Sequence, residues 1–180
     1  MSSEPSNLPS LPAPIIRHNP YVHVYDLVVL GGGLCGIGAA LAAAAEGRDV
    51  LLVERRAALA WELTSAFHAE LGPSELPCAR LIRRRINAVG GLRGDRTDQP
   101  TVEVALDMLV QESGIDLLLF SQPTRLDVQD DLVTGVWLGS KAGEQRVRGR
   151  AFVDATEEAL LWRQGGTSWS QPDARPVRQS

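Results

Sequence analysis

The apolar residues of the chain fall into short runs whose spacing predicts an α/β fold. Residues 25–30 and 49–53 are runs rich in Val and Leu, which is typical of strands buried on both faces of a parallel sheet. Between them, residues 34–46 are rich in Ala and precede Gly47, a residue favoured just after the end of a helix. The order of strand, helix and strand predicts a βαβ unit over residues 25–54.

Further elements are predicted beyond this unit. A helix is expected near residues 77–88, followed by a Gly/Arg/Asp loop at 90–98. From Thr101, which suits the N-cap, apolar residues recur at helical spacing until Gly114 closes the helix. Residues 115–120 then predict a third buried strand.

The segment after this strand has a different pattern. Three short, partly alternating runs at residues 124–128, 132–138 and 145–148 are separated by turn residues, which predicts a three-stranded β-meander. An apolar strand at 151–154 and a short helix at 157–164 follow. The sequence therefore predicts a Rossmann-like parallel sheet in which a three-stranded meander replaces one helical crossover, an organisation that resembles FAD/NAD(P)-binding domains.

Three regions are predicted along the chain. Residues 1–21 are rich in Pro and Ser and predict a flexible arm, and residues 166–180 predict a loose polar tail. One folded domain is predicted over residues 25–165, with an irregular or helical insertion at about 55–100.

Composition narrows the class of protein. The chain has 180 residues, a formal net charge of −4 and a pI near 5.4, which argues against nucleic acid or an anionic membrane as the main partner. No apolar run has the length of a membrane span or of a signal-peptide core. Only Cys35 and Cys78 occur, without metal-ligand spacing. We expect a cytoplasmic protein and no metal site.

A glycine motif follows the first predicted strand. Gly31, Gly33 and Gly36 match G-x-G-x-x-G between a strand and a helix, and Glu54 ends the next strand 18 positions after Gly36. This context predicts a dinucleotide site, with the diphosphate at the helix N-terminus and Glu54 on the adenosine ribose. The alternative is a glycine-rich turn that binds nothing.

Four stretches resemble the FAD-dependent oxidoreductases related to fumarate reductase and the thiazole-synthase-like flavoproteins, which share the glutathione-reductase-like FAD-binding fold. They are residues 26–36, residues 50–55, residues 113–120 with 133–136, and residues 151–156, which resemble the family's Asp-Ala-Thr-Gly motif. The resemblance covers most of residues 25–165 and implies FAD as the cofactor.

The resemblance also implies a set of cofactor-binding residues. The backbone around Leu34 and Cys35 would touch the diphosphate, and Glu54 and Arg55 would hold the adenosine. The segment at Pro123 and Thr124 would pass the adenine edge, and Thr156 closes the Asp-Ala-Thr motif. The full set is Gly31, Gly33, Leu34, Cys35, Gly36, Glu54, Arg55, Pro123, Thr124 and Thr156. No residue is assigned a catalytic role.

The chain departs from this family's pattern at three points. Ala60 and Trp61 replace glycines after the second strand, and Glu157 and Glu158 follow Thr156 where the family has glycine. Carboxylates there would repel a diphosphate unless they point away. Family members also continue into a substrate domain that covers the flavin, which this chain lacks, so a partner subunit could supply the flavin-covering half.

Other chemistry-bearing residues are weaker candidates. His18 and His23 are expected to be solvated, and His68 is a candidate for a substrate-side role. A basic cluster on the helix near 77–88 is either a solvated face or a contact for an anionic substrate or the flavin diphosphate. Its members are Arg80, Arg83, Arg84 and Arg85.

Two functions remain open at this point. The first is an FAD-binding oxidoreductase, or its N-terminal part, acting by hydride or electron transfer on an unknown small molecule. The second is a non-catalytic or degenerate dinucleotide-binding module that acts with a partner chain. A short-chain dehydrogenase is set aside because it needs a late Tyr-x-x-x-Lys pair, and the only tyrosines are Tyr21 and Tyr25.

Overall fold

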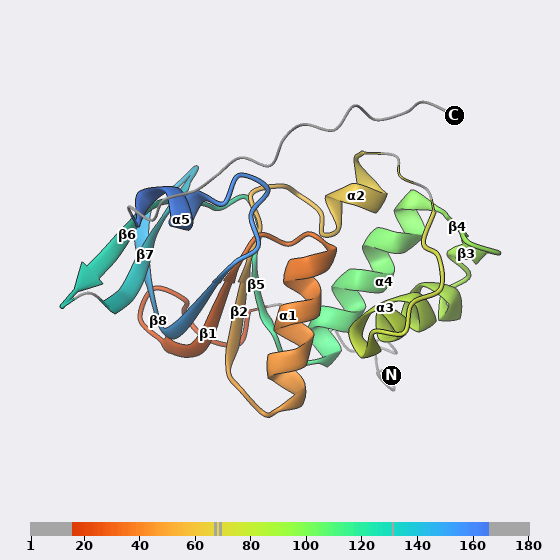
Figure 1. Ribbon diagram of the computed structural model, residues 1–180, viewed down its shortest axis with the longest axis horizontal. Helices are drawn as coiled ribbons and strands as arrows, with labels where there is room; N and C mark the ends of the chain where they lie inside the picture. Colours follow the sequence, from red (N-terminus) through yellow and green to blue (C-terminus); the bar gives the residue numbers. More distant parts are fainter. Residues whose placement is uncertain (1–15, 67, 69, 131, 166–180) are drawn as a thin grey trace, which may run out of the picture.

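A six-stranded sheet forms the centre of the molecule (Figure 1). The computed structural model describes residues 16–66, 68, 70–130 and 132–165. The strands lie in the order β5-β2-β1-β8-β7-β6. Their bounds are β1 Val24–Leu30, β2 Val50–Val53, β5 Asp116–Leu118, β6 Gln122–Gln129, β7 Leu132–Ser140 and β8 Gly143–Asp154. A small separate hairpin joins β3 (Leu92–Arg93) to β4 (Arg96–Thr97).

Half of the sheet is parallel and half is a meander. Strand β1 pairs in parallel with β2 on one side and with β8 on the other, and β2 pairs in parallel with β5. Strands β6, β7 and β8 pair antiparallel in succession. This arrangement confirms the predicted Rossmann-like sheet with a three-stranded meander.

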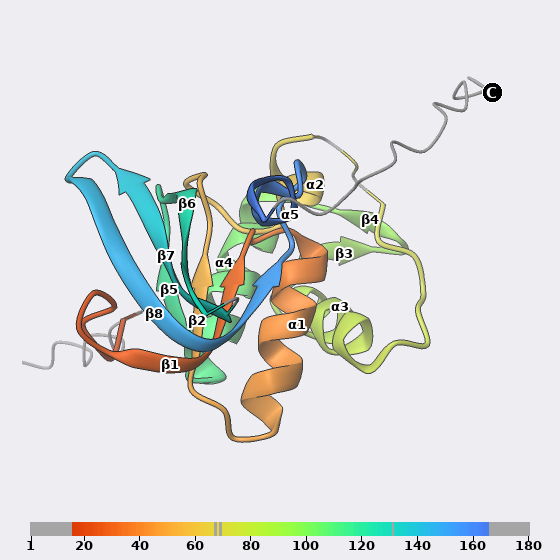
Figure 2. The same ribbon diagram turned by 60° about the vertical axis from the view of Figure 1, so that its left-hand side comes forward.

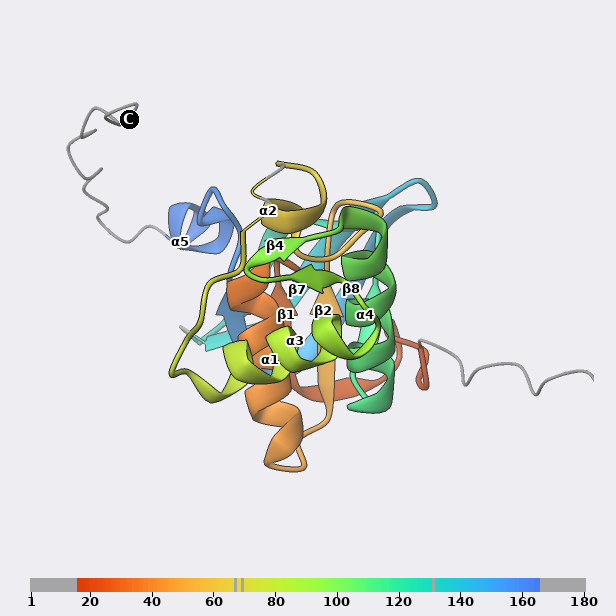
Figure 3. The same ribbon diagram turned by 90° about the vertical axis from the view of Figure 1, so that its right-hand side faces the viewer.

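Three helices cover one face of the sheet. They are α1 (Leu34–Ala45), α3 (Pro77–Ala88) and α4 (Gln99–Glu112), which lie together in front of the strands in Figure 3. Two short helices, α2 (Trp61–Thr64) and α5 (Leu160–Gln164), lie near the end of the sheet where β1 and β2 finish (Figure 1). This layering leaves the carboxyl ends of the parallel strands beside α1, α2 and α5.

The sheet separates two apolar cores. Residues of β1 and β2 that face the helices, such as Val29 and Leu52, pack against α1, α3 and α4. Their neighbours on the opposite face, such as Val28 and Leu51, pack with Val136 of β7 in the second core. Because side chains alternate along a strand, continuous Val/Leu runs supply both cores at once.

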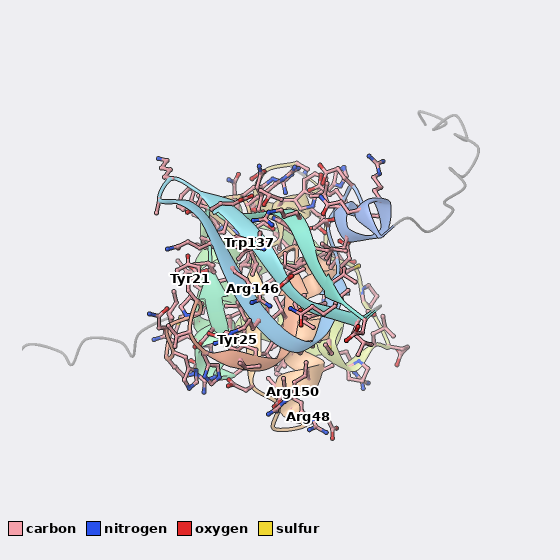
Figure 4. The ribbon with its side chains drawn as sticks, turned by 90° about the vertical axis from the view of Figure 1, so that its left-hand side faces the viewer. Tyr21, Tyr25, Arg48, Trp137, Arg146 and Arg150 are labelled. Carbon is pink, nitrogen blue, oxygen red and sulfur yellow. The ribbon has the colours of Figure 1, made fainter. Side chains whose placement is uncertain are left out.

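The outward face of the meander is polar. Trp137 of β7 lies opposite Arg146 of β8, and Figure 4 shows both side chains on this face. The Arg125 guanidinium lies 4.0 Å from the centre of the Trp137 ring, a cation–π contact that covers the exposed aromatic surface.

Strand β8 corrects one sequence prediction. The runs at 145–148 and 151–154 were predicted as separate strands, but they form one strand of 12 residues that runs from the hairpin to the side of β1 (Figure 2). Gly149 lies within it and does not break it. A Cβ at Gly149 would lie 2.8 Å from Val28 Cγ2, so the glycine lets β1 pack closely there.

Smaller differences concern element ends. The N-cap of α4 is Asp98 rather than Thr101, because the Asp98 carboxylate accepts a hydrogen bond from the Thr101 N–H at 3.3 Å. The loop predicted at 90–98 contains the hairpin of β3 and β4, and the insertion contains α2. The last helix starts at Leu160, not at residue 157.

The segment before β1 is anchored to the amino end of the sheet. Burial raises the pKa of the Asp116 carboxyl, but hydrogen bonds from Arg17, Tyr25 and His18 outweigh this and hold the pKa below its usual value. The Asp116 side chain is fully buried and accepts the Tyr25 hydroxyl at 2.8 Å. Burial, followed by this bond, raises the pKa of Tyr25.

His18 and His23 were predicted to be solvated, but in the structure both rings have hydrogen-bond partners. The His18 ring bonds Asp116 at 2.9 Å, and the His23 ring bonds Asp49. The two rings stack with their centres 4.1 Å apart. Residues 1–15 of the predicted arm and the predicted tail at 166–180 lie outside the described residues. Among the described helices, none is both long and apolar enough to cross a membrane.

Candidate functional site

The glycine turn between β1 and α1 is packed tightly against its neighbours. Gly31 has φ +100°, and its N–H donates to the Val53 carbonyl at 2.8 Å. A Cβ at Gly31 would lie 2.4 Å from the Ala155 carbonyl oxygen, and one at Gly36 would lie 1.8 Å from the Gly31 carbonyl oxygen. The turn therefore accepts only glycine at these positions, and α1 begins directly beside the ends of the strands.

Glu54 faces this turn. Its side chain is 3% exposed, and its Oε2 accepts the Gly32 N–H at 2.7 Å while Oε1 accepts the Arg56 N–H at 2.8 Å. A carboxylate has about four lone-pair sites. The Arg56 guanidinium also donates to Oε1 at 3.5 Å, so Glu54 retains acceptor capacity for ribose hydroxyl groups mainly at Oε2.

Glu62, which the sequence analysis missed, lies over the N-terminus of α1. Its two carboxylate oxygens are 3.1 and 3.3 Å from the Leu34 nitrogen, and the Leu34 N–H donates to them. A Cβ at Gly33 would lie 2.7 Å from Glu62 Oε1. The N-terminus of a helix attracts negative charge, so Glu62 holds the position that the motif predicts for a phosphate.

Helix α2 is held in place by its backbone and by its other side chains. Ala60 adopts a left-handed conformation with φ +49°, and its N–H donates to the Gly32 carbonyl at 2.7 Å. Leu63 and Thr64 are buried, and the Thr64 hydroxyl donates to the Leu59 and Ala60 carbonyls at 3.0 Å. A non-glycine residue rarely adopts this backbone conformation, so Ala60 is a strained position whose geometry is fixed by the packing of α2.

The two carboxylates after Thr156 form ion pairs. Glu157 lies 2.7 Å from Arg56 and 3.4 Å from Arg55, and Glu158 lies 2.8 Å from Arg55. The hydrogen bond from Arg56 to Glu157 raises the pKa of the Arg56 guanidinium. The carboxylates expected to repel a diphosphate are thus paired with the two arginines that follow β2.

A third carboxylate shapes the Asp-Ala-Thr turn. Asp154 Oδ1 accepts the Thr156 N–H at 3.0 Å and the Thr156 hydroxyl at 2.6 Å. Its Oδ2 accepts the Leu161 N–H at 2.8 Å. Asp154 therefore fixes the backbone between β8 and α5 beside the glycine turn.

These groups surround a cavity of about 220 Å³ at the carboxyl end of the parallel strands. Ligand pockets are usually larger, roughly 300–1,000 Å³. The lining residues are Gly31, Gly33, Cys35, Val53, Glu54, Arg55, Arg56, Trp61, Glu62, Ser121, Gln122, Pro123, Ala155, Thr156, Glu157, Glu158 and Leu160. A cavity at this end of an α/β sheet is where such folds bind ligands.

Seven of the ten cofactor residues expected from the sequence line this cavity: Gly31, Gly33, Cys35, Glu54, Arg55, Pro123 and Thr156. Leu34 contributes its N–H to Glu62, and Gly36 packs beneath the turn. Thr124 bonds the Trp137 carbonyl at 3.2 Å. Arg56, Trp61 and Glu62 also line the cavity and were not predicted as site residues. Trp61 and Glu62 belong to a helix of only four residues, which is too short to show a helical period, and Arg56 lies in a bend with no regular pattern.

The other candidates lie elsewhere. His68 is exposed, and its N–H donates to the Glu62 carbonyl at 3.1 Å. None of the four arginines of α3 lines the cavity. Three of them form ion pairs: Arg80 with Glu75 at 3.9 Å, Arg83 with Asp95 at 2.7 Å, and Arg85 with Glu112.

His18, His23 and Asp49 have ligand atoms within 4.8 Å of one another, as a metal site would require. The two rings, however, stack with only 10° between their planes, so their nitrogen lone pairs do not converge on one point. Each ring also bonds a carboxylate already. We assign this cluster to anchoring the segment before β1.

Comparison with known proteins decides the family. A family model described as FAD dependent oxidoreductase matches residues 26–177. The chain belongs to this family. The assignment confirms the predicted class of protein and FAD as its predicted cofactor.

Two curated relatives from different organisms have similar names. Digeranylgeranylglycerophospholipid reductase of Methanosarcina acetivorans is 27% identical over 153 residues, which cover 73% of this chain and 37% of that protein. Digeranylgeranylglycerophospholipid reductase 2 of Methanothermobacter thermautotrophicus is 32% identical over 141 residues, covering 68% and 37%. The chain thus spans little more than a third of these relatives.

Solved structures share the fold. The glycerol-3-phosphate dehydrogenase of Bacillus halodurans, solved with FAD, superposes with a TM-score of 0.63 and 17% identity over 82% of this chain and 37% of that chain. A geranylgeranyl bacteriochlorophyll reductase-like protein of Thermoplasma acidophilum gives a TM-score of 0.60 and 22% identity, covering 81% and 42%.

Proposed function

We propose that this chain forms the adenosine- and diphosphate-binding part of an FAD-dependent oxidoreductase that acts on a small molecule. One observation carries the proposal: the glycine turn at Gly31–Gly36 and the buried Glu54 face one cavity at the carboxyl end of the parallel strands. Bound FAD supplies hydride or electron transfer, while the protein supplies position and electrostatics.

The described residues fit the adenosine half of FAD. Backbone N–H groups at the start of α1 bind the diphosphate, and Glu54 accepts hydrogen bonds from the ribose hydroxyls. Pro123 is buried in the cavity wall and has no N–H, so its carbonyl is the group available to an adenine edge. Glu62 must leave the Leu34 N–H before a phosphate oxygen can use it.

The flavin ring needs protein beyond these residues. The curated relatives extend well past the matched part, which covers 37% of each. We propose that a further segment or a partner subunit covers the isoalloxazine and contributes the catalytic groups. Because the two relatives are named as reductases, we favour a reduction as the reaction.

A titration with cofactors tests the proposal. The purified chain is titrated with FAD, and binding is followed by flavin fluorescence and calorimetry. FMN is the matched control because it lacks the adenosine. We expect FAD to bind at least tenfold more tightly than FMN, a difference of about 1.4 kcal/mol. Absence of FAD binding, or equal affinity for FMN, would overturn the proposal.

A second candidate function is a degenerate nucleotide-binding module without turnover. It is favoured by Glu62, Glu157 and Glu158, since three carboxylates line the cavity that the motif predicts for a diphosphate. This candidate predicts adenine-nucleotide binding but no reduction of bound FAD by any electron donor, even with the partner chain added. Flavin reduction followed by absorbance would eliminate it.

We also propose a cytoplasmic location. Its support is that Cys35 and Cys78 are free thiols, as expected in a reducing compartment. Fractionation of cells that express the full protein tests this assignment.

A further inference from the structure

The N-terminus of α1 already holds an anion supplied by the chain itself. Both oxygens of Glu62 accept the Leu34 N–H, and one of them lies where a Cβ on Gly33 would clash. We propose that Glu62 is an intramolecular competitor for the FAD diphosphate, an inference that rests on the proposed function. The Glu62 carboxylate binds the N-terminus of α1 when no FAD is bound, and the FAD diphosphate displaces it on binding.

The charges around the cavity explain why Glu62 lies at the helix end. The lining includes four carboxylates, those of Glu54, Glu62, Glu157 and Glu158, against the two guanidinium groups of Arg55 and Arg56. Both guanidinium groups form ion pairs with Glu157 or Glu158. Among the ion pairs of the described residues, none involves Glu62, so its closest positive partner is the helix N-terminus.

The competition requires that Glu62 and a diphosphate exclude each other. A phosphate oxygen would bond the Leu34 N–H at about 2.9 Å, the same donor that Glu62 now uses. Two anions on one N–H group repel strongly in a partly closed cavity. Binding therefore exchanges one anion for another instead of filling a vacant helix end.

Release of Glu62 needs only a side-chain movement. Leu63 and Thr64 are buried, and the Ala60 N–H holds the start of α2 to Gly32. Glu62 itself is only half-buried, so its side chain can rotate toward solvent while α2 stays in place. The expected cost of release is one charge-assisted hydrogen bond, and no secondary structure has to unfold.

The first experiment compares ligands with and without phosphate. The full chain and its Glu62→Gln variant are titrated by calorimetry with FAD, ADP and adenosine. Because a charge at a helix N-terminus contributes about 1 kcal/mol, we expect the variant to bind FAD and ADP about fivefold to tenfold more tightly. Adenosine has no phosphate to compete with Glu62, so its affinity should not change.

Glu75→Gln is the matched control variant. It makes the same change of charge at a residue whose side chain is 99% exposed and does not line the cavity. Its affinities for all three ligands should equal those of the unmodified chain. This control separates the contact with Leu34 from a general effect of net charge.

The second experiment measures directly whether the Leu34 N–H at the start of α1 has an acceptor. Hydrogen exchange of the Leu34 amide is measured without ligand in the unmodified chain and in Glu62→Ala. The exchange should be faster in the variant, because its amide has lost its acceptor. Saturating FAD should then protect Leu34 in both proteins.

The outcomes separate this inference from the proposed function. Equal FAD affinity in the unmodified chain and Glu62→Gln overturns the competition while leaving FAD binding intact. A gain for adenosine as large as for ADP also overturns it, because the cavity would then merely have opened. If no variant binds FAD or ADP, the proposed function and the competition fail together.

Discussion

Two buried carboxylates lie at opposite ends of the parallel strands and have different surroundings. Asp116 begins β5 at the amino end, where the Arg17 and His18 amides and side chains and the Tyr25 hydroxyl donate to it. Glu54 follows β2 at the carboxyl end and accepts two short hydrogen bonds, both from backbone N–H groups. Both side chains are almost inaccessible to water, at 0% and 3% exposure.

The difference separates a carboxylate that anchors the chain from one that we propose binds the cofactor. A carboxylate can accept about four hydrogen bonds, and the donors around Asp116 use this capacity fully. Glu54 keeps part of its capacity and lines a cavity. Burial of a charged group is therefore not enough to indicate a ligand site; the number of acceptor positions still open is more informative.

The largest effect on stability and on FAD binding is expected from adding a side chain at the glycine turn, beside the carboxyl ends of the parallel strands. Gly36→Ala would place a Cβ 1.8 Å from the Gly31 carbonyl oxygen, so the start of α1 must shift away from the turn. We expect a loss of about 3 kcal/mol in the free energy of unfolding and a loss of FAD binding. Urea denaturation and FAD titration measure the two effects.

Gly38→Ala in the same helix is its control. A Cβ there would meet only Cys78 Cβ, at 3.8 Å, which is ordinary contact. The higher helix propensity of Ala should raise the free energy of unfolding by up to about 1 kcal/mol. Equal destabilisation by both variants would show that Gly36 is not constrained by the turn.

The second largest effect on stability is expected at the amino end of the parallel strands, where Asp116 lies. Asp116→Asn removes a buried charge that accepts several hydrogen bonds, and we expect a loss of about 2–3 kcal/mol in the free energy of unfolding at pH 7. FAD affinity should not change, because Asp116 does not line the cavity. Denaturation and cofactor titration of the same variant test both halves of this prediction.

The pH dependence follows from the lowered pKa of Asp116. A carboxyl whose pKa is lower in the folded state stabilises the protein above its unfolded pKa, near about 3.9, and loses this effect as the pH falls through the folded value. The stability difference between the unmodified chain and Asp116→Asn should thus be constant from about pH 5 to 7 and shrink below about pH 4. If this stability difference instead grew as the pH fell, the proposed anchoring role of Asp116 would be wrong.

The smallest effect on stability is expected from the ion pairs at the cavity. Glu157→Gln removes the carboxylate that pairs with both Arg55 and Arg56. All three side chains are about one-third exposed, so the free energy of unfolding should change by less than about 0.5 kcal/mol. FAD affinity should rise about threefold, since the Arg56 guanidinium loses its 2.7 Å partner and becomes more available to the diphosphate, while Arg55 stays paired with Glu158. Glu75→Gln, which loses a pair with Arg80 away from the cavity, should change neither quantity.

Much of the cofactor-facing backbone could be predicted from the sequence, because it depends on neighbours in the chain. The spacing of Gly31, Gly33 and Gly36 between two Val/Leu runs specifies a turn, a helix start and two buried strands. The Asp116 anchor could not be predicted, since its donors are 91 to 99 residues away in the sequence. A pattern of neighbouring residues cannot predict a contact between residues so far apart in the sequence.

Glu62 was missed for a related reason. It lies 28 residues from Leu34, and the helix that carries it has only four residues. The replacement of glycine by Ala60 and Trp61 was visible in the sequence, but the consequence was not. In the structure, Ala60 adopts a left-handed backbone conformation directly before α2, and its N–H donates to the Gly32 carbonyl of the glycine turn.

The unbroken course of β8 has a consequence for cooperativity. One strand of 12 residues pairs with β7 through its first half and with β1 through its second, so it belongs to the meander and to the parallel sheet. Neither half of the sheet can open without releasing the other. Amides of β1, β7 and β8 should therefore exchange with a single opening free energy, as one folding unit that ends beside the cavity residues Gly31 and Ala155.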